Sequence, residues 1–79
     1  RDYLCEEFQR LGLSWVPTQA NFILVDVNRP CRPVFEGLLR KGVIIRTGDI
    51  FGLPTFLRVT IGREEDNRRF IAALEAVLA

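Results

Sequence analysis

The chain has 79 residues, of which 48% are hydrophobic and 27% are charged, and its formal net charge is +1. This composition is typical of a folded domain rather than a disordered segment, and a chain of this size buries only about 60 to 65% of its extended surface. The small net charge argues against nucleic acid as a partner, despite a local basic cluster at Arg29, Arg32, Arg40 and Lys41. We therefore expect one domain, or part of one, with a small core.

Two observations bear on the cellular compartment. The longest apolar runs are too short to cross a bilayer, and residues 1–7 do not resemble a signal peptide because acids interrupt any apolar stretch. Cys5 and Cys31 are too few and too dispersed for a disulfide framework or a four-ligand zinc site. We expect both to be small hydrophobic side chains in a reducing compartment, so the sequence predicts a cytoplasmic protein with no membrane partner.

The first predicted element in chain order is the end of an amphipathic helix over residues 1–12. A glycine, Gly12, marks its end, and its apolar side chains recur at helical spacing at Leu4, Phe8 and Leu11. No capping residue is visible at its start. We therefore expect this helix to enter from a preceding domain of a longer protein.

Two strands, or one bent strand, are predicted next. Residues 14–16 and 21–27 are rich in β-branched and aromatic side chains, and Pro17 separates them. The second run is apolar over most of its length, which is typical of a strand that is buried on both faces.

A helix, two strands and a final helix are predicted for the rest of the chain. Turn residues precede a helical stripe over residues 32–41, and the strands follow at residues 43–46 and 57–61, joined by a loop that contains glycine and proline. The last helix is apolar on one side. Its first turn carries acids that offset the positive end of the helix dipole, a role we favour over catalysis: Glu64, Glu65 and Asp66.

This order of elements predicts an α+β fold. We expect a two-layer sandwich, in which helices pack mainly on one face of a small, mostly antiparallel sheet. The opposite face of the sheet then needs a cover. Where its aromatic side chains are partly uncovered, they predict an apolar patch on which another domain or subunit docks, formed by Trp15, Phe22, Phe51 and Phe56.

The strongest candidate site is a pair of arginines on strands. Arg58 and Thr60 share one face of the strand at residues 57–61, and Arg46 ends the strand at residues 43–46. A guanidinium donates two parallel hydrogen bonds that match a carboxylate or a phosphate. Two such groups converging on one anion predict a site for a small acidic ligand.

An ordinary structural role for these arginines is the alternative. They are then exposed, or paired with Asp26, Asp49 or a helix acid, and exposed pairs of that kind contribute about 0 to 1 kcal/mol. A regulatory module that senses a small anion by itself, and an interaction domain that pairs with a second copy, remain open on these grounds.

Several kinds of chemistry are excluded by residues that the sequence lacks. There is no histidine, which removes the Ser-His-Asp and Cys-His nucleophile systems and the common zinc signatures. No glycine-rich phosphate loop is present. Lys41 is the only lysine, and its place at the end of a predicted helix favours a surface residue over one that binds a cofactor covalently.

Several motifs together resemble the C-terminal small domain of histidinol-phosphate aminotransferase, over essentially the whole chain. They are residues 19–25 (QANFILV), 42–46 (GVIIR), 51–54 (FGLP) and 57–62 (LRVTIG), followed by 65–67 (EDN) and Phe70. The resemblance implies the aspartate-aminotransferase-like fold. In that fold a large domain, absent from these 79 residues, holds pyridoxal phosphate, and the small domain closes over the substrate.

The resemblance also implies roles for particular residues. Arg58 binds the substrate's carboxylate or phosphate, Arg46 is the second anion-binding arginine, and Asn21 lies near the active site, although a hydrogen bond at the strand start is its alternative role. The implied reaction converts histidinol phosphate and 2-oxoglutarate to imidazole acetol phosphate and glutamate, in histidine biosynthesis. The chain is expected to bind no cofactor and to be inactive by itself, and its partners are its own large domain and the second subunit of a homodimer.

Related enzymes share the same small-domain pattern. Threonine-phosphate decarboxylase and the aromatic amino acid aminotransferases are the alternatives to histidinol-phosphate aminotransferase. The two motifs at residues 51–54 and 58–62 favour histidinol phosphate as the substrate of the complete enzyme.

Overall fold

The computed structural model describes residues 2–17, 21–49 and 52–79. Within these ranges, three helices and four strands follow one another in the chain as α1 (Asp2–Arg10), β1 (Ser14–Pro17), β2 (Phe22–Asp26), α2 (Cys31–Arg40), β3 (Arg46–Thr47), β4 (Phe56–Thr60) and α3 (Glu64–Leu78). The order and type of the elements agree with the prediction. Of the two alternatives, two strands are present rather than one bent strand, and Pro17 is the last residue of β1, opposite Ile23 of β2.

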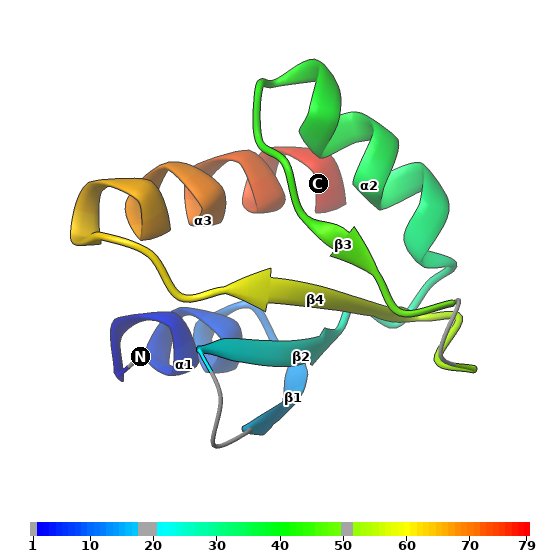
Figure 1. Cartoon of the computed structure of the whole chain (residues 1–79), viewed down its shortest axis with the longest axis horizontal. Coiled ribbons are helices and arrows are strands. Elements are labelled where there is room, and N and C mark those ends of the chain that lie inside the picture. The colour runs from blue at the N-terminus through cyan, green and yellow to red at the C-terminus, as the bar shows by residue number, and fades with distance from the viewer. Residues whose placement is uncertain (1, 18–20, 50–51) are drawn as a thin grey trace.

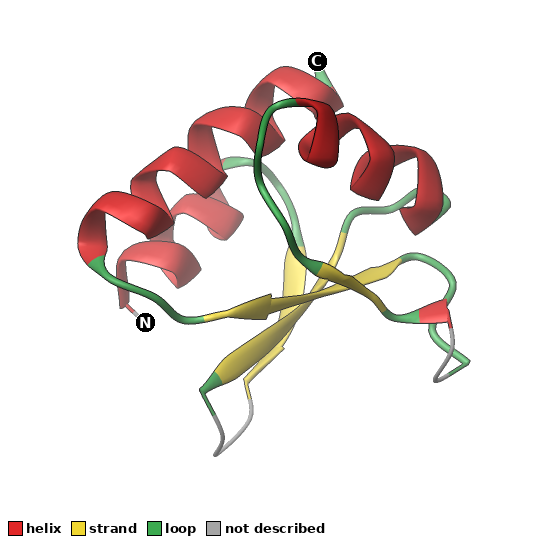
Figure 2. Cartoon of the chain, turned by 45° about the horizontal axis from the view of Figure 1, so that its top comes forward, coloured by secondary structure: helices red, strands yellow, loops and turns green. Residues whose placement is uncertain are grey.

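The strands form one antiparallel sheet in the order β1-β2-β4-β3, and the helices form a second layer on one side of it (Figure 1, Figure 2). The predicted α+β two-layer sandwich is therefore confirmed. The side chains that β2 and β4 send toward the helices are buried, namely Ile23, Val25, Leu57 and Val59. We call this side of the sheet the covered face and the other side the open face.

β2 differs from the prediction that it is buried on both faces. Its burial alternates, because Ile23 and Val25 are buried while Phe22 and Leu24 on the open face are half-buried. The three α-helices, α1, α2 and α3, lie on the same side of the sheet, and Phe22 and Leu24 on the opposite side are not fully covered by the described chain. Apolar composition alone does not distinguish a strand covered twice from one that still lacks a cover.

Trp15 departs from the predicted aromatic patch. It is opposite Val25 in the sheet register, so both side chains lie on the covered face, and its ring lies 6.3 Å from that of Phe8 of α1. Phe22 and Phe56 are half-buried on the open face, as expected, and Phe51 lies outside the described residues. The open-face patch therefore includes Phe22 and Phe56 but not Trp15.

β3 is shorter than the predicted strand at residues 43–46. It contains only Arg46 and Thr47, because the chain first has to descend from the helix layer to the sheet (Figure 1). The N–H group of Val43 still donates to the carbonyl of Leu38 in α2, and the Ile44 side chain is 80% exposed. A β-branched run thus serves as a connection here, since its position between two layers overrides its propensity.

The connection from β4 to α3 is held by a buried amide. Asn67 in the first turns of α3 is only 8% exposed, and its Oδ1 accepts a hydrogen bond of 3.1 Å from the N–H of Gly62. Its Nδ2 donates to the Gly62 carbonyl over 3.3 Å. This pair of bonds fixes the direction in which the chain leaves the strand that carries Arg58.

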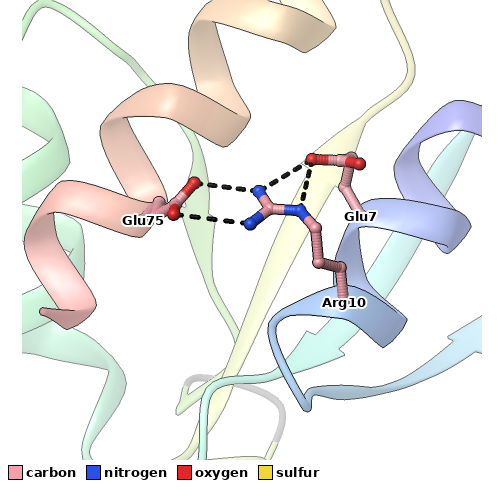
Figure 3. Close-up of polar contacts among 3 residues, drawn as sticks. All are labelled: Glu7, Arg10 and Glu75. Atoms are coloured by element: carbon pink, nitrogen blue, oxygen red, sulfur yellow. Dashed lines mark hydrogen bonds and ion pairs between the residues drawn. The ribbon is translucent and has the colours of Figure 1, made fainter.

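Charged side chains join α1 to α3 at the surface. Arg10 donates to Glu7 one turn earlier and to Glu75 of α3, with shortest distances of 2.8 Å to each carboxylate (Figure 3). The hydrogen bond from Arg10 lowers the pKa of the Glu75 carboxyl, and both acids raise the pKa of Arg10. All of these side chains are solvent-exposed to some degree, so the contribution of the bridge to stability is small.

No helix in the described ranges combines the length and the apolar character that a membrane crossing requires.

Candidate anion-binding site

The open face of the sheet carries the arginines that the sequence analysis singled out. Arg58 lies in β4, and its directly opposite neighbours are Leu24 of β2 and Arg46 of β3. Directly opposed residues in an antiparallel sheet share one face, with Cβ atoms about 4.5 to 5.5 Å apart. The register therefore brings Arg46 and Arg58 together, as predicted.

This placement of two arginines is unfavourable without a ligand. Like charges that are directly opposite in a sheet repel and destabilise it. Arg46 is exposed and Arg58 is half-buried, so water screens the first better than the second. A bound anion would remove the repulsion and contact both side chains.

The predicted acidic partners are engaged elsewhere. Asp49 forms its ion pair with Arg32 of α2, and Asp26 accepts a hydrogen bond from the N–H of Asn28. Among the described residues, no ion pair includes Arg46 or Arg58. Pairing with Asp26 or Asp49, which the sequence left open, is therefore not how the structure neutralises these arginines.

The Arg58 guanidinium lies in an apolar setting. Its Cζ is 4.3 Å from the centre of the Phe22 ring, and its Nε is buried with no hydrogen-bond partner within the described chain. A cavity of about 300 Å³ adjoins it and is lined by Phe22, Leu24, Leu53 and Arg58. A buried donor without a partner costs free energy, which an acceptor on a ligand would recover.

Asn21 is not gathered into this site. It directly precedes β2, its side chain is exposed, and it does not line the cavity beside Arg58. Its backbone carbonyl accepts a hydrogen bond of 2.7 Å from the N–H of Ile61. The alternative given for Asn21, a hydrogen bond at the strand start, is thus present through the backbone, and a ligand role stays a prediction.

The described residues do not fit a covalent site for pyridoxal phosphate. Lys41, the only lysine in the sequence, is exposed at the end of α2, where its backbone N–H donates a hydrogen bond to the backbone carbonyl of Leu38. A lysine that reacts as an amine is commonly activated by desolvation, which an exposed helix end does not provide. Lys41 therefore lies at the surface of the described chain, as the sequence predicts.

Sequence reasoning missed the apolar lining of the site. Leu24 and Leu53 were not assigned a role, and Phe22 was expected in a docking patch rather than against Arg58. The register between β2 and β4 places Phe22 and Leu24 beside Arg58, and a single sequence does not contain this register. Leu53 comes from the connection that precedes β4, so its position beside the site depends on how that connection folds.

Comparison with known protein families identifies the class of protein to which this chain belongs. The model of the family described as aminotransferase class I and II matches residues 1–74. The chain belongs to this family.

Within this family, the chain is similar to proteins named histidinol-phosphate aminotransferase. The chain is 61% identical to histidinol-phosphate aminotransferase of Moorella thermoacetica over all 79 residues, which are 20% of that protein. It is 57% identical to the histidinol-phosphate aminotransferase of Symbiobacterium thermophilum over 96% of this chain and 21% of that protein. The chain thus spans about a fifth of the length of these relatives, and its predicted C-terminal position in a longer protein stays a prediction.

Solved structures agree with the fold. A structure of a putative aminotransferase from Burkholderia pseudomallei superimposes with a TM-score of 0.87 at 33% identity, covering 100% of this chain and 24% of that one. The histidinol-phosphate aminotransferase of Clostridium acetobutylicum superimposes with a TM-score of 0.85 at 29% identity, covering 99% of this chain and 25% of that one.

Proposed function

We propose that these 79 residues are the small domain of a longer, pyridoxal-phosphate-dependent histidinol-phosphate aminotransferase, in which Arg58 and Arg46 bind the anionic group of the substrate. One observation carries this proposal. The two arginines are opposite each other on neighbouring strands, without an acidic partner in the described chain, and the Nε of Arg58 is buried and unpaired. A bound anion would accept hydrogen bonds from these donors and offset the two positive charges.

The substrates follow from the chemistry of two guanidinium groups and from the names of the relatives. A planar guanidinium forms two parallel bonds with a phosphate or with a carboxylate, so one site serves histidinol phosphate in one half-reaction and glutamate in the other. Relatives at 61% and 57% identity are named histidinol-phosphate aminotransferase, which favours this reaction over the decarboxylase and aromatic aminotransferase alternatives.

The rest of the longer protein supplies what this chain lacks. Pyridoxal phosphate provides the electron sink for amino transfer when it is bound there. Arg58 and Arg46 orient the substrate by its anionic end and do not move protons, because a guanidinium stays protonated at physiological pH. The open face, with Phe22 and Phe56 half-buried, is the surface on which the large domain closes, and a second subunit completes the cytoplasmic enzyme.

The test uses the full-length enzyme loaded with pyridoxal phosphate. The half-reaction with histidinol phosphate is followed through the cofactor absorbance for wild type, Arg58→Ala and Arg58→Lys. Removing one partner of a buried, charged hydrogen-bonded pair costs about 2 to 5 kcal/mol, so kcat/KM of Arg58→Ala should fall by a factor of about 30 or more.

Arg58→Lys should rescue this loss only poorly, because an ammonium does not form the two parallel bonds. Near-normal kinetics of both variants would refute the role of Arg58. Absence of the reaction in wild type, together with activity on threonine phosphate or an aromatic amino acid, would assign the enzyme to one of the related classes.

A further inference from the structure

We infer that Phe22 is a positioning residue for the anion site: its ring holds the Arg58 guanidinium in the orientation in which its N–H groups receive the substrate. This inference rests on the proposed substrate-binding role of Arg58. It concerns which residue orients the Arg58 guanidinium, and neither the sequence motifs nor the family comparison assigns that role to any residue.

The register explains why these two side chains meet. Phe22 of β2 is opposite Thr60, and Leu24 is opposite Arg58, so Phe22 is the diagonal neighbour of Arg58 on the open face. Diagonal neighbours in a sheet are within reach of aromatic and long side chains. The Cζ of Arg58 lies 4.3 Å from the centre of the Phe22 ring, well inside the range of a cation–π contact.

Arg58 has few other contacts that could orient it. Within the described chain, Arg58 forms no ion pair and its Nε forms no hydrogen bond. A long, flexible side chain without such bonds populates several rotamers and loses that freedom when it binds. The ring of Phe22 restricts these rotamers before the substrate arrives, because Phe22 is itself anchored in a strand next to the fully buried Ile23.

The way in which the ring contacts the guanidinium preserves its binding capacity. A separation of 4.3 Å between Cζ and the ring centre allows the guanidinium to stack with its flat face on the ring, whereas hydrogen bonds to a phosphate or carboxylate lie in the guanidinium plane. The ring therefore orients Arg58 without competing for its donors. The adjoining cavity of about 300 Å³ has Leu24 and Leu53 as further lining residues, and this apolar surround strengthens a charged hydrogen bond formed there.

The experiment compares two substrates in the full-length enzyme loaded with its cofactor. Histidinol phosphate has the anionic group that Arg58 is proposed to bind, and histidinol lacks it. The ratio of their kcat/KM values measures recognition of the anion and is insensitive to a general loss of folded enzyme. Phe22→Leu should lower this ratio about threefold to thirtyfold, mainly through a higher KM for histidinol phosphate, since this is the range of a cation–π contact.

Three further variants make the test specific. Phe22→Tyr keeps an aromatic face and should retain the wild-type ratio within about twofold. Phe22→Met is a second non-aromatic replacement that should reproduce the lower ratio, and it substitutes for Phe22→Leu where that variant does not fold. Phe56→Leu makes the same chemical change on the open face away from the cavity, so its ratio should equal that of the wild type.

The outcomes separate this inference from the proposed function. If Arg58→Ala lowers the ratio but Phe22→Leu and Phe22→Met leave it unchanged, Arg58 binds the anion without help from Phe22 and the inference is wrong. An equal loss for both substrates in the Phe22 variants would also overturn it, since that result indicates a structural role. If Arg58→Ala leaves the ratio unchanged, the proposed function fails and the inference fails with it.

Discussion

The two faces of the sheet are built from the same strands but serve different purposes. On the covered face, alternate residues of β2 and β4 pack against three helices and are almost completely buried. On the open face, the intervening residues of β2 and β4 include half-buried aromatic rings and Arg58, whose Nε has no hydrogen-bond partner within the described chain. Arg46 of the neighbouring strand β3 lies opposite Arg58. The covered face stabilises the domain, and the open face retains unsatisfied groups that a ligand and a second domain can satisfy.

This comparison has a physical basis in the cost of unsatisfied groups. A fold with a small core has little stability to spare, and repelling charges or an unpaired buried donor reduce it further. Unsatisfied polar groups that persist in a folded domain are typical of functional sites. Four sets of substitutions test whether the covered face provides most of the stability while the open face binds the ligand. They follow in order from the largest expected effect on stability to the smallest.

The largest effect is expected on the covered face. Leu57 in β4 is completely buried, so Leu57→Ala leaves a cavity in the core and should lower the free energy of unfolding by about 2 to 5 kcal/mol. The matched control is Leu24→Ala, the same change at a half-buried position on the open face of the neighbouring strand. Denaturant unfolding of both variants checks the comparison, and equal losses would show that the open face is packed as tightly as the covered one.

The next effect concerns the connection between β4 and α3. Asn67→Ala removes two hydrogen bonds and leaves both polar groups of Gly62 without this partner, which should cost about 1 to 3 kcal/mol of stability. Asn67→Asp keeps an acceptor for the Gly62 N–H group and should cost less. Chemical denaturation measures both values, and an Asn67→Ala protein as stable as the wild type would show that these bonds do not hold the connection.

A smaller effect of opposite sign is expected on the open face. Arg46→Glu replaces a like-charged pair by an opposite-charged pair with Arg58, so stability should rise by about 0.2 to 1 kcal/mol. The same change should abolish stabilisation by added inorganic phosphate, which the wild type should show if the arginines bind anions. The thermal unfolding midpoint of Arg46→Gln should lie between those of the wild type and Arg46→Glu. A less stable Arg46→Glu protein would contradict repulsion between the arginines.

The smallest effect is expected at the surface bridge between α1 and α3. The hydrogen bond from Arg10 lowers the pKa of Glu75 in the folded protein, so the unfolded state takes up a proton first as the pH falls. The stabilisation is therefore fully present above the ordinary glutamate pKa of about 4.3 and is lost as the pH falls through the lower, folded value. Unfolding midpoints between neutral and acidic pH should decline slightly less for Glu75→Gln than for wild type.

Much of this architecture was accessible from local patterns. Helical spacing of apolar residues predicted α1 and α2 to within about two residues at each end, and it predicted the final helix, α3, with its acidic first turn. Alternation in residues 57–61 placed Arg58 on one face of the strand and Leu57 on the other. These features depend on neighbours along the chain. The motifs around Arg46 and Arg58 also indicated the aminotransferase family, to which the chain belongs.

Other features were decided only when distant segments packed together. The side chain of Trp15 lies on the covered face, and residues 43–45 form a connection despite their strand propensity. Phe22 contacts Arg58. Each of these outcomes depends on strand register or on which layer a segment must reach, and neither is encoded in local spacing. The sequence by itself determined which residues are apolar, charged or able to turn, whereas packing of the helices on one side of the sheet decided which of them form the core and which form the site.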